Sequence, residues 1–186
     1  MATPRSLLEL YVQAKDSVRP QLMREIYAPD AVLTYSIATD SISFPARTVG
    51  LDAITRTLVV EFATRFERCK TFYVCDAPPA ADARFVRIPW LVAMRETAAR
   101  SLRIGRGYYE WTFTDPIRVS AMHIHIERMD ALPDPDAALL AAAHEGLSYP
   151  WLARSLLRTT YAQRADQSNA LGFLRELQHP IDLPVA

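Results

Sequence analysis

The sequence has no excess of either charge and no long apolar run. Of its 186 residues, 21 are Lys or Arg and 21 are Asp or Glu, so the formal net charge at pH 7 is zero. This balance argues against nucleic acid as the main partner, because phosphate binding relies on excess positive charge, and against an anionic membrane surface. The longest apolar runs, 88–94 and 137–143, are far shorter than the roughly 20 residues that cross a bilayer.

Cysteine is also scarce. Cys69 and Cys75 are too few for a disulfide framework and lack the spacing of a zinc site, so we expect two reduced, partly buried thiols. At the N-terminus an amphipathic segment bearing Glu9 stands where a signal peptide would have its apolar core. The sequence therefore predicts a cytoplasmic protein with one folded domain or one domain plus an appendage.

The first third of the chain predicts helices around one strand. Thr3 is a good helix cap and Pro4 a good first helical residue. A second short apolar stripe ends near residue 28, and residues 31–36 are rich in strand-forming types. Apolar residues spaced by four then predict a third helix over residues 51–66.

The middle of the chain predicts strands, and the end predicts helices. Strands are expected at 70–75, 84–97, 100–114 and 117–128, and the short breaks between the last three imply antiparallel pairing. Gly105 and Gly107 indicate a bulge inside one strand rather than a phosphate-binding loop. The last 55 residues predict three helices, with Trp151 in the second.

This order of elements resembles the nuclear transport factor 2-like superfamily, which includes ketosteroid isomerases, polyketide cyclases and scytalone dehydratase. The resemblance rests on Leu10-Tyr-Val12, on residues 26–32 (Ile-Tyr-Ala-Pro-Asp-Ala-Val) and on residues 49–54 (Val-Gly-Leu-Asp-Ala-Ile). It implies an α+β fold in which a cone-shaped, curved antiparallel sheet packs under three N-terminal helices. The expected domain spans residues 1–131, and residues 132–186 form a helical extension packed on it.

Alternation along the strands gives each one an apolar face and a mixed face. The apolar faces should pack under the helices, where the family encloses a hydrophobic pocket. We expect the ligand pocket to involve Trp90, Tyr109, Trp111, Met122 and Ile124, although aromatic residues at central positions are also typical of a plain core. The resemblance places a homodimer interface on the mixed, convex face.

His123 and His125 form the sharpest local motif. Two residues apart on a strand, they point to the same face, a spacing found in strand-borne metal sites. Three interpretations stay open: a polar sheet face or dimer interface, proton transfer inside the pocket, or metal binding. Because a third ligand is not nearby in sequence, we expect no metal, and the chemistry we consider needs no cofactor.

Tyr11 and Tyr35 are the other candidate catalytic residues. Tyr11 matches the position where isomerase-like sequences place a tyrosine that hydrogen-bonds the substrate oxygen. Tyr35 and Tyr109 occupy positions that carry aspartates in that pattern, and tyrosine is a poor base at neutral pH. The loss of both carboxylates argues against steroid-type isomerisation, and Asp40 is the nearest possible substitute.

Two functions follow from these patterns. The first is binding of a hydrophobic small molecule, with possible cofactor-free acid–base chemistry such as isomerisation, dehydration, cyclisation or hydrolysis. The second is a non-catalytic dimeric module for ligand or protein binding. The extension has an apolar stripe that must pack on something, and we expect it near the pocket mouth of its own subunit.

Overall fold

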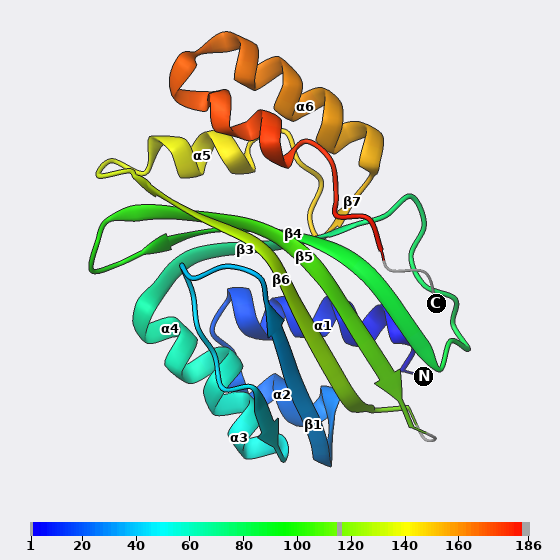
Figure 1. Cartoon of the computed structure of the whole chain (residues 1–186). Helices are drawn as coiled ribbons and strands as arrows, with labels where there is room; N and C mark the ends of the chain where they lie inside the picture. Colours follow the sequence, from blue (N-terminus) through cyan, green and yellow to red (C-terminus); the bar gives the residue numbers. More distant parts are fainter. Residues whose placement is uncertain (1, 115–116, 184–186) are drawn as a thin grey trace.

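A curved sheet lies between two layers of helices (Figure 1). The structure is a computed structural model that describes residues 2–114 and 117–183. Within these residues the sheet has seven strands in the order β2-β1-β6-β5-β4-β3-β7. The fold is α+β, as the sequence predicts.

The strands form a mixed sheet. Strands β3, β4, β5 and β6 pair antiparallel in chain order and form a meander, as expected. By contrast, β1 runs parallel to β6, and β7 runs parallel to β3. The strand bounds are β1 Tyr27–Ile37, β2 Arg47–Val49, β3 Phe66–Val74, β4 Phe85–Glu96, β5 Ser101–Phe113, β6 Val119–Pro133 and β7 Trp151–Leu152.

The first layer of helices covers the concave face of the sheet (Figure 1). It consists of α1 Pro4–Asp16, η1 Pro20–Leu22, α2 Met23–Ile26, α3 Leu51–Thr55, η2 Arg56–Glu61 and α4 Phe62–Arg65. Helix α1 begins as predicted: the Thr3 hydroxyl accepts a hydrogen bond from the Ser6 backbone amide at 3.2 Å, and Pro4 follows the cap. Segments α3, η2 and α4 run without a break, and the wide π-turns of η2 turn Leu58 and Val59 inward.

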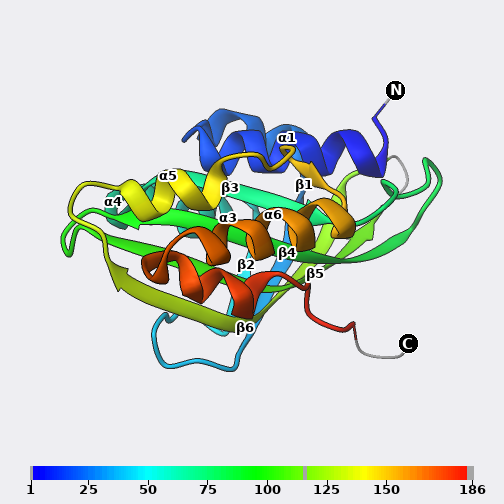
Figure 2. The same cartoon turned by 90° about the horizontal axis from the view of Figure 1, so that it is seen from above.

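The second layer is the C-terminal extension, which includes α5 Ala138–His144, α6 Arg154–Gln167 and the 3₁₀ segment η3 Asn169–Leu177. It covers the outer, convex face of the sheet rather than the pocket mouth, as the view from above shows (Figure 2). The expected position near the pocket mouth was therefore wrong, although the extension does pack on its own chain. The physical reason is that the outer face is itself apolar over β3, β4 and β5, where Phe72, Leu91, Leu102 and Ile104 are fully buried under the extension.

Among the boundaries that differ from the predicted ones, two concern residues assigned to helices. Phe66 continues the apolar helical spacing but is the first residue of β3, because the helix ends at Arg65 and the chain turns extended there. Trp151 and Leu152 extend the sheet as β7 instead of opening a helix, since Tyr73 and Val74 of β3 offer them an open edge.

The glycine pair marks a bulge between β5 and β6, as predicted. The register shifts between Arg106 and Gly107. A Cβ atom at Gly107 would lie 1.9 Å from the carbonyl oxygen of His125, and one at Gly105 would lie 2.2 Å from that of Arg128. Only glycine permits so close an approach of two backbones.

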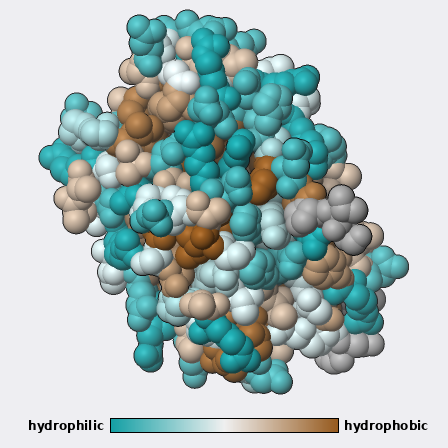
Figure 3. All heavy atoms as spheres, viewed as in Figure 1, coloured by the Kyte–Doolittle hydropathy of each residue, from teal (hydrophilic) through white to brown (hydrophobic). Residues whose placement is uncertain are grey.

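The apolar side chains are mostly internal. In the view of Figure 1 the surface carries only scattered hydrophobic patches between polar areas (Figure 3). No helix within the described residues is long and apolar enough to cross a membrane.

Candidate functional site

A small cavity lies between the concave face of the sheet and the first helical layer. Its volume is about 50 Å³, little more than one water molecule occupies in the liquid. Helices and the loop 38–46 form one side, and β1, β4, β5 and β6 form the other. The lining residues are Tyr11, Lys15, Tyr35, Ile42, Phe44, Leu58, Phe62, Trp90, Val92, Met94, Tyr109, Ile124, Ile126 and Met129.

Three buried hydrogen-bond donors in this lining lack a partner. The hydroxyls of Tyr11 and Tyr35 and the indole Nε1 of Trp90 make no hydrogen bond within the described chain. A buried polar group left unsatisfied costs about 1–3 kcal/mol. Burial raises the pKa of Tyr11 and of Tyr35 above the ordinary tyrosine value, so both phenols keep their protons near neutrality and can donate to an acceptor.

Lys15 is the charged member of the cavity lining, and sequence reasoning missed it. Its ammonium lies 2.8 Å from Asp16 Oδ1, donates to Cys69 Sγ at 3.2 Å and stands 4.7 Å from the centre of the Phe62 ring. Burial alone would lower the pKa of Lys15, but the Asp16 carboxylate, with smaller contributions from Cys69 and Tyr11, raises that pKa above the ordinary value. The signal in the sequence was that Lys15 follows Tyr11 by four positions on the apolar stripe of α1.

Asp16 is held by several donors besides the lysine. Its carboxylate accepts from the Thr71 amide at 2.7 Å, from the Thr71 hydroxyl at 3.1 Å and from the Tyr149 hydroxyl at 3.0 Å. These bonds tie α1 to β3 and to the extension. The carboxylate thus lies behind Lys15 and is not among the groups that line the cavity.

The residues predicted for the ligand pocket divide into two groups. Trp90, Tyr109 and Ile124 line the cavity. Trp111 and Met122 lie deeper in the core: the Trp111 ring contacts the Tyr11 ring edge-on at 5.0 Å, and the Met122 sulfur accepts a hydrogen bond from the Tyr27 hydroxyl at 2.9 Å.

The predicted catalytic residues are also separated. Tyr11 and Tyr35 reach the cavity, whereas His123 and His125 lie on the outer face of the sheet. In the described residues no cluster of three or more His, Cys, Asp or Glu side chains could hold a metal ion. Asp40 is exposed in the loop after β1.

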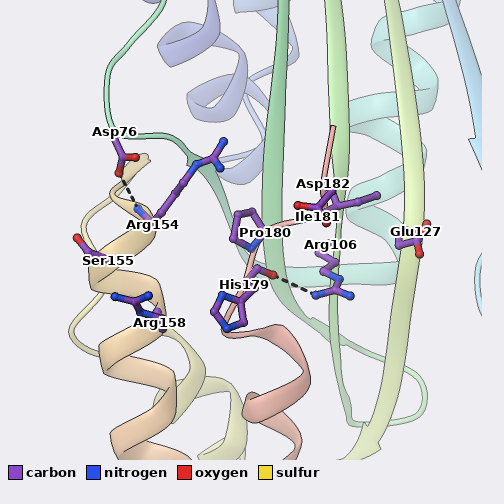
Figure 4. Close-up of a pocket in the computed structure, with 10 residues that line it drawn as sticks. All are labelled: Asp76, Arg106, Glu127, Arg154, Ser155, Arg158, His179, Pro180, Ile181 and Asp182. Carbon is purple, nitrogen blue, oxygen red and sulfur yellow. Dashed lines mark hydrogen bonds between the residues drawn. The ribbon is translucent and has the colours of Figure 1, made fainter. Parts of the chain in front are cut away.

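A larger hollow of about 1200 Å³ lies between the extension and the outer face of the sheet (Figure 4). Charged side chains of both signs line it, among them Arg106, Arg154, Arg158, Asp76 and Glu127. The Arg106 guanidinium donates to the carbonyl oxygens of Glu176 and His179 at 3.1 and 3.0 Å. We assign the candidate site to the inner cavity, because there the walls are apolar and the polar groups are buried donors without acceptors.

The inner cavity therefore offers donors and apolar surface. Of the residues that line it in the described chain, Lys15 alone is charged, and none is an Asp, Glu or His. Such a lining suits an apolar molecule with an oxygen that accepts hydrogen bonds.

Comparison with known proteins gives the fold its name. No protein-family model and no curated protein matches the sequence, but solved structures match it at low identity. A nuclear transport factor 2-like superfamily protein from Salmonella enterica has a TM-score of 0.52 at 14% identity, over 64% of this chain and 85% of its own. A protein with a ketosteroid isomerase-like fold from Catenulispora acidiphila, solved with trimethylamine, has a TM-score of 0.53 at 13% identity, over 66% and 85%.

A computationally designed 17-OHP binder gives a TM-score of 0.54 at 12% identity, over 70% of this chain and 99% of its own. Sequence identities this low show a shared fold and not a shared activity. They confirm the resemblance at that level: the chain has the nuclear transport factor 2-like fold.

Proposed function

We propose that this protein binds a small apolar molecule bearing an oxygen acceptor, such as a cyclic ketone, in its inner cavity. The observation that carries the proposal is the set of buried, unpartnered donors of Tyr11, Tyr35 and Trp90 in an otherwise apolar lining. A ligand oxygen would satisfy donors whose isolation costs free energy in the empty protein. The designed 17-OHP binder supports the idea, since the same fold has been given a small-molecule site.

Ligand entry requires the cavity to widen, because about 50 Å³ is far below the roughly 300 Å³ of the smallest usual ligand pockets. We infer that the loop 38–46 moves, because among the lining segments of the described chain it alone lies outside the helices and strands. It contributes Ile42 and Phe44 to the lining, and Phe44 stacks on Tyr35 with ring centres 4.8 Å apart. Displacing Phe44 would open the cavity beside the Tyr35 hydroxyl.

Binding is favoured over acid–base turnover. Isomerisation or dehydration needs a base within hydrogen-bond reach of the proton it removes. Lys15 is held protonated by Asp16 and the tyrosines keep their protons, so the lining groups act as donors. Tyr11 and Tyr35 would polarise a bound carbonyl, and a base would have to come from the ligand or from water.

The homodimer expected through the sheet face loses part of its support. Leu91, an apolar residue on that face of β4, is 1% exposed because the chain's own extension covers it. The uncovered part of that face has polar side chains that hydrogen-bond to one another. We therefore favour a monomer at micromolar concentration, and sedimentation giving twice the monomer mass would reverse this inference.

Thermal unfolding with matched probes tests the proposed function. Cyclohexanone and methylcyclohexane have similar size, and only the ketone carries an acceptor. We expect cyclohexanone to raise the midpoint of unfolding and methylcyclohexane to raise it less. Equal shifts would show that the donors play no part, and no shift with any small cyclic ketone would contradict the proposal.

A further inference from the structure

The two histidines outside the cavity belong to a continuous chain of hydrogen bonds on the outer face. Thr34 and Ser36 of β1 lie beside His123 and His125 of β6. The Thr34 hydroxyl is 2.8 Å from His123 Nδ1, and the Ser36 hydroxyl is 2.8 Å from His123 Nε2 and 2.7 Å from His125 Nδ1. His125 Nε2 lies 3.2 Å from Glu127 Oε2.

Glu127, the last residue in this series of hydrogen bonds, determines which group donates and which accepts in each of them. An ionised Glu127 can only accept, so the proton of a neutral His125 sits on Nε2 and its Nδ1 accepts. Ser36 must then donate to His125 Nδ1 and accept from His123 Nε2. Thr34 donates to His123 Nδ1, and all four bonds are satisfied.

The surroundings hold this arrangement in place. The Tyr108 ring stacks on the His125 ring with centres 4.7 Å apart. Other charged groups lie near this chain: Glu110 is paired across the sheet with His123, and Arg87 is 2.7 Å from Glu110. Arg47 of β2 is paired with Thr34, and Arg106 lines the same hollow as Glu127. Burial, opposed by Glu110, lowers the pKa of His123, consistent with the neutral ring that the bonds require.

We propose that Ser36 is a nucleophilic serine that takes an acyl group from an activated ester, with His125 as its general base. A hydroxyl hydrogen-bonded to an imidazole whose other nitrogen is held by a carboxylate is the recurring arrangement of activated serines. Glu127 is a positioning residue that fixes the tautomer of His125. His123 is a second positioning residue that fixes the hydroxyl.

The reaction is a simple acyl transfer. Ser36 Oγ attacks the carbonyl carbon and forms a C–O bond, while its proton passes to His125 Nδ1. The bond between the carbonyl carbon and the leaving oxygen breaks, and the electron pair leaves with that oxygen. His125 then returns the proton to the leaving group or to water.

Ser36 is half-buried and lies outside the area that the extension covers.

Acetylation by p-nitrophenyl acetate tests the proposal. Peptide mapping by mass spectrometry should find an acetyl group on Ser36 early in the reaction, with release of one equivalent of p-nitrophenolate. Ser120, whose hydroxyl donates to the Thr112 carbonyl at 3.2 Å, has no histidine partner among the residues that the structure describes and serves as the internal control. Acetylation of Ser36 no faster than that of Ser120 would overturn the proposal. If the protein proves to be a homodimer and Ser36 is not acetylated in it, the proposal is overturned as well.

Matched variants separate a base from a structural residue. The amide oxygen of His125→Asn can accept from Ser36 without removing its proton, so we expect acetylation of Ser36 to slow about 100-fold. Glu127→Gln should slow it about tenfold or more, because the tautomer is no longer fixed. Ser36→Cys should keep an acylatable group and Ser36→Ala should lose it. Equal rates in wild type and His125→Asn would contradict the assignment of the base even if Ser36→Ala failed to fold.

Discussion

At the scale of single residues, the pair Lys15–Asp16 is the feature that most separates this chain from a plain apolar core. The two side chains are 6% and 4% exposed. We expect Lys15→Met to lower the free energy of unfolding by about 3 kcal/mol, because removing one partner leaves a buried charge uncompensated. Urea unfolding measures this, with Lys70→Met at an exposed site as the control. A loss as small as that of the control would contradict the account.

The same pair predicts a dependence on alkaline pH. The pKa of Lys15 is raised in the folded protein, so the folded state holds this proton more tightly than the unfolded chain does. The resulting stabilisation is complete below the unfolded lysine pKa of about 10.4 and is lost as the pH rises above it. The loss of stability above about pH 10 should be smaller in Lys15→Met than in wild type, and parallel curves would count against the raised pKa.

Trp111 tests which face of β5 points inward. Its side chain is fully buried against Tyr11 and Tyr27, so Trp111→Ala should cost about 3–5 kcal/mol by opening a cavity. Tyr108, on the opposite face of the same strand, supplies the comparison. Denaturant unfolding of Trp111→Ala that shows a loss under about 1 kcal/mol would mean that the strand is out of register by one residue.

Single residues were also the hardest to predict from the sequence. Alternation correctly separated Trp90, Trp111 and Ile124 from His123 and His125, since the period of a strand is a local property. The role of Lys15 was missed, because a lone lysine on an apolar stripe is explained only by Asp16, Thr71 and Tyr149 arriving from three other segments.

At the scale of elements, the C-terminal extension covers the outer face of the sheet and shields it from solvent. Truncation after Pro133 would expose four residues that the extension buries: Phe72, Leu91, Leu102 and Ile104. We expect the truncated chain to aggregate or to unfold at a lower temperature, since contiguous apolar patches of this kind are rarely left in water. Light scattering and thermal unfolding measure this. A monodisperse truncated chain with unchanged stability would refute the role given to the extension.

His144 makes the docking of α5 sensitive to acid. Its Nε2 donates to the Ala93 carbonyl at 3.0 Å, and burial lowers the pKa of His144 to about 4. The unfolded chain takes up this proton near its ordinary pKa of about 6.5, so stability falls as the pH drops from about 6.5 to about 4. We expect the loss between about pH 7 and about pH 4.5 to be smaller in His144→Gln by about 2 kcal/mol. An equal loss in the variant would contradict this.

The position of the extension could not be read from the sequence. Its apolar stripe showed that it packs somewhere, but the matching apolar area is spread over three strands distant from it along the chain. Alternation places Leu91 on the face where a dimer interface is expected, and a face buried by another subunit has the same sequence pattern as one buried by the same chain.

At the scale of the whole molecule, the fold was the most predictable feature. The order of helices and strands and the opening of helix α3 after Gly50 are local signals, and the solved structures match the chain at the level of the overall fold. The size of the cavity was not predictable, since it depends on how the loop 38–46 and the π-turns of η2 pack against the sheet.

Calorimetric titration with cyclohexanone tests the central claim, that the inner cavity is a ligand site whose tyrosines donate to the ligand. The double variant Tyr11→Phe/Tyr35→Phe keeps the apolar walls and removes two donors, and we expect it to bind at least about tenfold more weakly, the equivalent of about 1.4 kcal/mol. Val92→Phe, which fills the cavity from β4, should abolish binding. Affinity unchanged in both variants would place the ligand elsewhere and contradict the account.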